Sequence, residues 1–144
     1  MRVIIFEVAM EVRLKFSEQE IEELVQLLEQ REGVEIECIP QLGGGIWLHD
    51  PTWEMELRLL LLLNYKVTVS RVCFIHKRQG TMTAVLDFLI RFCREHGVPQ
   101  ICVQSVETKE MANFCLKNGF VPDPTASFET EKGLILGDYV LSID

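Results

Sequence analysis

The spacing of hydrophobic residues near the start of the chain predicts an amphipathic helix. A capping-box sequence, Ser17-Glu-Gln-Glu20, precedes apolar residues that recur three and four positions apart as far as Leu28. Gly33 follows the last of them, and glycine commonly ends a helix. We therefore expect a helix between Ser17 and Gly33.

The remainder of the first half reads as strands. Residues 2–6 are rich in β-branched side chains, residues 34–39 form a short candidate strand that stops at Pro40, and residues 46–48 follow a glycine-rich turn. Residues 54–63 are ambiguous, because leucine favours helix while the early alternation of apolar and charged residues favours a strand. We interpret 54–63 as a strand entering the core.

The second half begins with a strand, a polar loop and a helix. Residues 66–75 alternate and are β-branched, which is typical of a strand, and residues 76–79 are polar up to Gly80. From Thr81 the apolar residues take up a helical period, which Gly97 ends. The order predicts a strand that joins the N-terminus of a helix through a short loop.

The chain then continues with another strand and a shorter helix. Residues 101–106 are an apolar strand, and a helix starts at Glu107 or Thr108 and closes at Asn118-Gly119. The chain next enters a loop through Pro122 and Pro124, and residues 134–143 form the terminal strand. A strand–helix–strand unit implies parallel neighbours joined by a right-handed crossover, so we expect an α/β fold.

Composition narrows the class of protein. The chain has 144 residues, 48% of them hydrophobic and 25% charged, which fits one globular domain. Its net charge is −8, with 14 basic against 22 acidic residues. Binding to nucleic acid requires a basic surface, so we expect no nucleic-acid partner. An acidic surface suits a cationic substrate such as an amine, and it also serves simple solubility.

Cysteine usage and hydropathy point to the cytoplasm. The five cysteines are spread out with no C-x-x-C pair, a pattern typical of free thiols in a reducing compartment, and it predicts neither a disulfide framework nor a metal site. The longest purely apolar run is 59–63, far short of the ~20 residues that span a bilayer. We expect a cytoplasmic protein with no membrane partner.

Residues 72–83 carry the clearest chemical signal. Lys77 and Arg78 stand directly before Gly80, at the point where the predicted strand meets the predicted helix. The first amides of a helix lack intrahelical partners and attract anions, and glycine allows close approach of the backbone. Two threonine hydroxyls in the first turn add donors. The segment predicts a phosphate site, and a polar surface turn before a helix is the alternative.

A second motif extends this reading. Lys77-Arg-Gln-Gly80 resembles the pyrophosphate loop of the GNAT superfamily of acetyl-CoA-dependent N-acetyltransferases, and Phe114-Cys-Leu-Lys-Asn-Gly-Phe120 resembles that family's Phe-Tyr-x-Lys-x-Gly-Phe signature. About 40 residues separate Gly80 from Gly119, with one helix and one strand between them, as in the family. The resemblance covers residues 66–143 well, whereas residues 1–64 fit by length and order.

The resemblance implies a fold and a division of the chain. The expected architecture is a mixed central sheet of about six or seven strands flanked by helices, in which a splayed pair of parallel strands forms the cleft for coenzyme A (CoA). Residues 1–144 would form one domain, with an acceptor-side half at 1–64 and a CoA-binding half at 65–144. The family resemblance is also compatible with a homodimer.

The resemblance further implies roles for individual residues. Backbone groups of 72–74 would pair with the pantetheine arm, amides of 78–83 would hold the pyrophosphate, and Lys77 or Arg78 would add charge. Thr108 stands where the family often has a pantetheine-binding asparagine. The implied cofactor-binding residues are Val72, Cys73, Phe74, Lys77, Arg78, Gln79, Gly80, Thr81, Met82, Thr83 and Thr108.

Three positions depart from the family pattern. Met82 replaces the second small residue of the loop, and Met111 replaces a usual alanine. Cys115 stands where the family's tyrosine protonates the departing thiolate. A thiol can donate a proton in principle, and the alternative is that Cys115 only fills the core.

The proton acceptor for the amine is not marked by a motif. Glu54 and Glu56 are candidates, because they would lie near the cleft if 54–63 precedes the cofactor strand. His76 and Glu107 flank the loops at the strand ends, and a solvated surface role is the alternative for each of these residues. Trp47 and Trp53 flank Asp50-Pro51 and fit either an acceptor pocket or turn packing.

The resulting functional interpretation is an acyltransferase. The chain would move an acetyl group from acetyl-CoA to a primary amine by direct attack, with no metal and with the amine acceptor unidentified. Two alternatives remain open at this point. One is a CoA-binding module of the same fold without acetyl transfer, and the other is an α/β domain that binds a phosphate metabolite.

Overall fold

A computed structural model describes residues 14–77 and 79–144 of the chain. The strand expected over 2–6, and Arg78 of the expected phosphate loop, lie outside the described residues. The helices and strands along the chain are α2 (Glu18–Glu32), β1 (Glu37–Pro40), the 3-10 turn η1 (Leu42–Gly44), β2 (Ile46–His49), β3 (Glu56–Leu62), β4 (Lys66–Cys73), α3 (Thr81–His96), β5 (Gln100–Val106), α4 (Lys109–Lys117), β6 (Val121–Glu129) and β7 (Ile135–Ser142).

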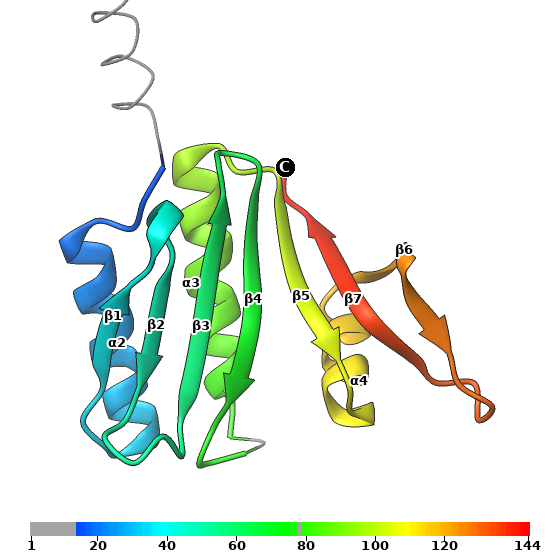
Figure 1. Cartoon of the computed structure of the whole chain (residues 1–144), viewed down its shortest axis with the longest axis horizontal. Coiled ribbons are helices and arrows are strands. Elements are labelled where there is room, and N and C mark those ends of the chain that lie inside the picture. Colours follow the sequence, from blue (N-terminus) through cyan, green and yellow to red (C-terminus); the bar gives the residue numbers. More distant parts are fainter. Residues whose placement is uncertain (1–13, 78) are drawn as a thin grey trace, which may run out of the picture.

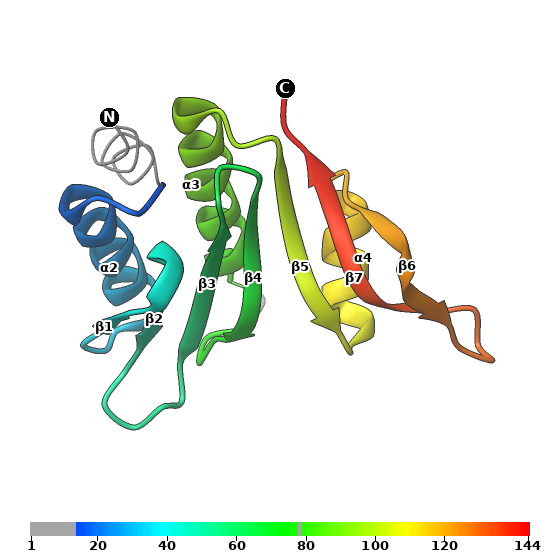
Figure 2. The ribbon, with the colours of Figure 1, turned by 45° about the horizontal axis from the view of Figure 1, so that its top comes forward.

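The described strands form one mixed sheet. Its order is β1-β2-β3-β4-β5-β7-β6, and seven strands take part among the described residues. β4 and β5 run parallel, and the other neighbouring pairs run antiparallel. Figures 1 and 2 show α2 and α3 behind β1 to β4, with α4 behind β5 and β7. The expected α/β class with a mixed sheet is confirmed.

α2 forms where the capping sequence predicts it. The Ser17 hydroxyl accepts a hydrogen bond from the Glu20 amide at 3.1 Å, and the Glu20 carboxylate accepts one from the Ser17 amide at 2.8 Å. Gly33 ends the helix in the left-handed conformation at φ 70°. Leu24 and Leu28 are fully buried on the side that faces the core. The local sequence therefore determines both ends of this helix.

The ambiguous leucine-rich segment is a strand. In β3 the leucines at 57, 59 and 61 are buried, while the residues between them are half-buried, which is the two-residue period of a strand with one packed face. β3 pairs with β4 from Glu56↔Cys73 to Leu62↔Lys66, with a bulge between Arg58 and Leu59. The strand interpretation of this segment is confirmed.

α3 supplies much of the core. Its apolar residues are not all equally packed, because Met82 and Ile90 are half-buried. Its fully buried apolar residues are Val85, Leu86, Phe88, Leu89, Phe92 and Cys93. Neither α3 nor any other helix of the described chain combines the length and apolar character that crossing a bilayer requires.

The prediction of a loop through Pro122 and Pro124 is wrong. Both prolines lie within β6, which is the edge strand beside β7. An edge strand needs only one of its two rows of backbone donors, so it tolerates proline. The pairing is also irregular between Pro122 and Ser127, where the register shifts. The prolines shape this edge and do not end it.

Candidate functional site

The parallel strands β4 and β5 separate before they end. Their pairing runs from Lys66↔Gln100 to Val69↔Val103, yet β4 continues to Cys73 and β5 to Val106. Figure 1 shows the two strands diverging toward their arrowheads. Past Val69, the backbone of β4 on the β5 side therefore has no strand partner among the described residues, and its donors and acceptors are available to a ligand.

A cavity of about 610 Å³ opens at this separation. Its wall combines the end of β4, the following loop, the first turn of α3 and one side of α4. The lining residues are Val72, Cys73, Phe74, His76, Lys77, Gly80, Thr81, Met82, Thr83, Thr108, Glu110, Met111 and Phe114. The structure thus brings together most of the residues that the sequence predicts for the cofactor.

The N-terminus of α3 forms one end of the cavity. Gly80 is the N-cap in the left-handed conformation, at φ 83°, and no side chain caps the helix. The first intrahelical bond runs from the Ala84 amide to the Gly80 carbonyl, so the preceding amides have no partner within the helix. The Thr81 side chain is 2% exposed, and its hydroxyl has no hydrogen-bond partner among the described residues. These donors and the helix dipole suit an anion.

The residues of the loop before α3 do not all face the cavity. Lys77 and His76 line the cavity, whereas Gln79 does not. The Gln79 carbonyl instead accepts a hydrogen bond from Arg31 Nη1 at 3.3 Å. Gln79 therefore links the loop to α2 through its backbone carbonyl.

α4 forms the opposite wall. Thr108 caps this helix, because its hydroxyl accepts a hydrogen bond from the Met111 amide at 3.2 Å, and it also borders the cavity. Glu110, Met111 and Phe114 line the cavity although they are not among the predicted cofactor residues. The i, i+3 spacing of Met111 and Phe114 is the signal that places both on one side of α4.

Cys115 lies away from the cavity. It is fully buried and is not among the lining residues. Burial, and then the neighbouring Cys102, raise the pKa of the Cys115 thiol to about 12. A thiol in this position packs against the core and is poorly placed to deliver a proton to a ligand in the cavity.

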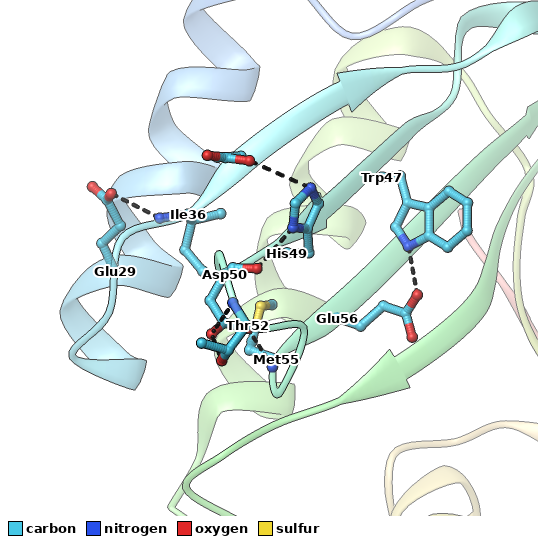
Figure 3. A network of polar contacts seen from close by, with 9 residues as sticks. Glu29, Ile36, Trp47, His49, Asp50, Thr52, Met55 and Glu56 are labelled. Carbon is cyan, nitrogen blue, oxygen red and sulfur yellow. Dashed lines mark hydrogen bonds and ion pairs between the residues drawn. The ribbon is translucent and has the colours of Figure 1, made fainter.

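The two candidate bases differ in their surroundings. Glu54 lies in an exposed turn, where its carboxylate accepts a hydrogen bond from the Thr52 hydroxyl at 3.4 Å. The Glu56 side chain is 14% exposed and accepts hydrogen bonds from Trp47 Nε1 at 2.7 Å and from Arg71 Nε at 3.0 Å. Figure 3 shows the Trp47 indole directed at Glu56. Neither carboxylate lines the cavity, but Glu56 is the cross-strand partner of Cys73, which does.

An aromatic group lies beside Glu56. Trp53 is 47% exposed and stacks on His49 with 3.5 Å between ring centroids, and its edge meets Trp47 at 5.5 Å. The backbone of Trp53 adopts φ 60°, which is unusual for a bulky residue. The turn is held by Asp50, whose carboxylate accepts from the Met55 amide at 2.8 Å (Figure 3). Both tryptophans therefore pack around this turn, outside the cavity.

Comparison with known proteins locates the chain by structure. Its sequence matches no protein-family model and no curated protein. The Ard1 protein from Thermoplasma volcanium is similar over 91% of this chain and 96% of its own, with a TM-score of 0.51 and 14% identity. An IAA acetyltransferase from Bacillus cereus is similar over 75% and 98%, with a TM-score of 0.51 and 10% identity.

A further solved structure is that of a GNAT family acetyltransferase from Elizabethkingia anophelis with acetyl-CoA bound. It is similar over 89% of this chain and 83% of its own, with a TM-score of 0.46 and 11% identity. At these identities the similarity concerns the fold. The mixed sheet with parallel β4 and β5, matched across most of the chain, identifies the fold as that of the GNAT acetyltransferases.

Proposed function

We propose that this protein is an acetyl-CoA-dependent N-acetyltransferase that acts on a primary amine. The observation that carries the proposal is the cavity between the end of β4 and α4, beside the point where β4 and β5 separate, which is closed at one end by the N-terminus of α3. A ligand with an anionic group at one end and an extended amide-containing arm fits both features. CoA has this chemistry.

The residues present suit CoA at each part of the cavity. The backbone of β4 near Val72 and Cys73 offers free hydrogen-bonding groups to the pantetheine amides, and the amides at the start of α3 suit the pyrophosphate. Lys77 lines the cavity and adds positive charge. The half-buried Met82 side chain lies in the cavity wall and leaves its own backbone amide available.

Acetyl-CoA would supply a thioester to the amine. A C–N bond forms as the C–S bond breaks, the amine loses a proton, and the CoA sulfur leaves as a thiolate. The pKa of an ordinary thiol is about 8.5, so this leaving group needs little help from an acid, and the buried Cys115 is not required. We retain Glu56 as the proton acceptor, acting directly or through water, because it adjoins Cys73 at the cavity wall.

Binding is tested first. The purified protein is denatured and examined for co-purified CoA by mass spectrometry, and its melting temperature is measured with acetyl-CoA, ATP and NAD. At a hundredfold excess over Kd, acetyl-CoA should raise the melting temperature by roughly 5–10 °C, because such binding adds about 2.7 kcal/mol. Stabilisation by ATP or NAD but not by acetyl-CoA would refute the proposal and favour a phosphate-metabolite site.

Transfer is tested next by free thiol release from acetyl-CoA over a panel of primary amines. Amine-dependent release supports the enzyme. The second candidate function is a CoA-binding module without transfer, and the observation that favours it is that neither candidate proton acceptor, Glu54 or Glu56, lines the cavity. Tight CoA binding with no release above the amine-free rate would establish that alternative.

A further inference from the structure

Glu32 joins the end of α2 to the loop that precedes α3. It is the last residue of α2 and only 1% exposed. Its Oε2 accepts hydrogen bonds from the Ile75 amide at 2.8 Å and from the His76 amide at 3.1 Å. These two amides open the loop that leads to Gly80, more than forty positions along the chain.

The position of Glu32 is unfavourable for α2 itself. The C-terminal end of a helix carries partial negative charge, which disfavours an acidic side chain there. Burying a carboxylate also costs free energy unless it is fully hydrogen-bonded, and Glu32 Oε1 has no partner among the described residues. Neither the helix nor the core accounts for this residue, so its contribution must come from the two loop amides.

The neighbouring residue of α2 holds the other end of the same loop. Arg31 Nη1 donates to the Gln79 carbonyl at 3.3 Å, and a Cβ placed on Gly80 would lie 3.3 Å from the same nitrogen. The last two residues of α2 therefore contact the loop at its start and just before α3. His76 and Lys77, which line the cavity, lie between these two contacts in the sequence.

We propose that Glu32 is a positioning residue for the phosphate-binding loop. It does not line the cavity, and it acts by fixing the backbone at Ile75 and His76 so that Lys77 and the first amides of α3 face one ligand. The inference rests on the proposed function, because it assigns the CoA pyrophosphate to this loop. It also makes the acceptor-side half of the chain part of the cofactor site.

A simple Coulomb argument predicts the opposite effect. A carboxylate beside a pyrophosphate repels it, so removing Glu32 would strengthen CoA binding if the loop were rigid by itself. Positioning predicts weaker binding upon removal. The two hypotheses predict opposite changes in CoA affinity when Glu32 is removed, so one measurement of Kd separates them.

The test compares Glu32→Ala, Glu32→Gln and a matched control, Glu29→Ala. Glu29 lies on the same helix and accepts a hydrogen bond from the Ile36 amide at 3.0 Å, away from the cavity, so its loss removes a similar contact without touching the loop. Kd is measured by calorimetry for CoA and for pantetheine, which lacks the phosphates. We expect about tenfold weaker CoA binding in E32A, unchanged pantetheine binding, partial recovery in E32Q, and wild-type values in E29A.

A second readout does not depend on CoA. Amide hydrogen exchange at Ile75 and His76 in the free protein should accelerate at least tenfold in E32A and less in E32Q, with no change in E29A. Unchanged exchange, equal or tighter CoA binding, or equal losses for CoA and pantetheine would each overturn the inference. If wild-type protein fails to bind CoA while the loop amides respond as expected, the proposed function fails and the loop-positioning role of Glu32 stands apart from it.

Discussion

Substitution of Gly80 by alanine tests the site through its backbone. Gly80 is the N-cap of α3 and has φ 83°, a region that costs an L-residue about 1–2 kcal/mol. Gly33 at the end of α2 provides the matched control, because its φ is 70° and an added Cβ would have no neighbour within 4 Å in the part of the chain that the structure describes. At Gly80 the new Cβ would meet Arg31 Nη1 at 3.3 Å and nothing else among the described residues, and this nitrogen is the end of a flexible side chain.

The backbone cost should therefore be similar in the two variants. We expect Gly80→Ala and Gly33→Ala each to lower the free energy of unfolding by about 1–2 kcal/mol, which corresponds to a fall in melting temperature of roughly 3–8 °C. Urea denaturation followed by circular dichroism measures this quantity. A much larger loss in G80A alone would mean that the contact with Arg31 cannot relax.

Of the two glycines, Gly80 lines the cavity and Gly33 does not, so only the replacement of Gly80 should weaken CoA binding. The added methyl group would lie on the N-cap of α3 and would contact Arg31 Nη1, the atom that donates to the Gln79 carbonyl. We expect CoA affinity, measured by calorimetry, to fall about tenfold in G80A and to stay at the wild-type value in G33A, since one tenfold step corresponds to about 1.4 kcal/mol. Wild-type affinity in G80A would refute the assignment of this backbone to the pyrophosphate.

Three further predictions address the acid, the base and the response to pH. Cys115→Ala should lower the free energy of unfolding by about 1 kcal/mol, because it leaves a small void in the core. It should leave amine-dependent CoA release unchanged, and a tenfold drop in release would show that the thiol takes part in the reaction. Glu56→Gln should lower the turnover number by about a hundredfold or more without changing the Kd for CoA, whereas Glu54→Gln should have little effect, and equal rates in the two variants would exclude Glu56 as the base. Burial alone would raise the pKa of Glu20, but hydrogen bonds with Ser17 and His96 hold this pKa below its ordinary value of 4.5. The ionised Glu20 therefore stabilises the folded state fully above pH 4.5, and this stabilisation is lost as the pH falls through the lower pKa of the folded state. The urea midpoint of Glu20→Gln should therefore change less than that of wild type between about pH 6 and about pH 3, and equal changes would contradict this account.

Local signals in the sequence predict the parts of the site that depend on neighbouring residues. The capping box at Ser17 and the glycines at 33 and 97 delimit two helices, because helix ends are determined within a few residues. The basic loop before Gly80 likewise lies where strand and helix patterns meet. The structure places the predicted cofactor residues in the cavity wall, apart from Gln79 and from Arg78, which lies outside the described residues.

Contacts between segments that are distant in the sequence leave no local signal and cannot be predicted from it. Glu32 reads as an ordinary charged residue at the end of a helix, and only the tertiary structure brings it to Ile75. The prolines of β6 read as loop residues because the sequence does not reveal that this strand lies at an edge. On α4, Met111 and Phe114 line the cavity while Cys115 is buried in the core, and the apolar spacing of these residues does not by itself separate the two environments.

The early end of the pairing between β4 and β5 bears on how such a protein diverges. The separated strand ends and the first turn of α3 present main-chain atoms to the cavity, and every amino acid except proline supplies the same amide and carbonyl. Main-chain contacts of this kind place no demand on side-chain identity beyond the exclusion of proline, provided that the two strands still part and the helix still begins at that point. Selection that acts on main-chain geometry leaves the identity of the amino acids largely open. A fold shared over most of the chain at 10% and 14% sequence identity is consistent with such selection.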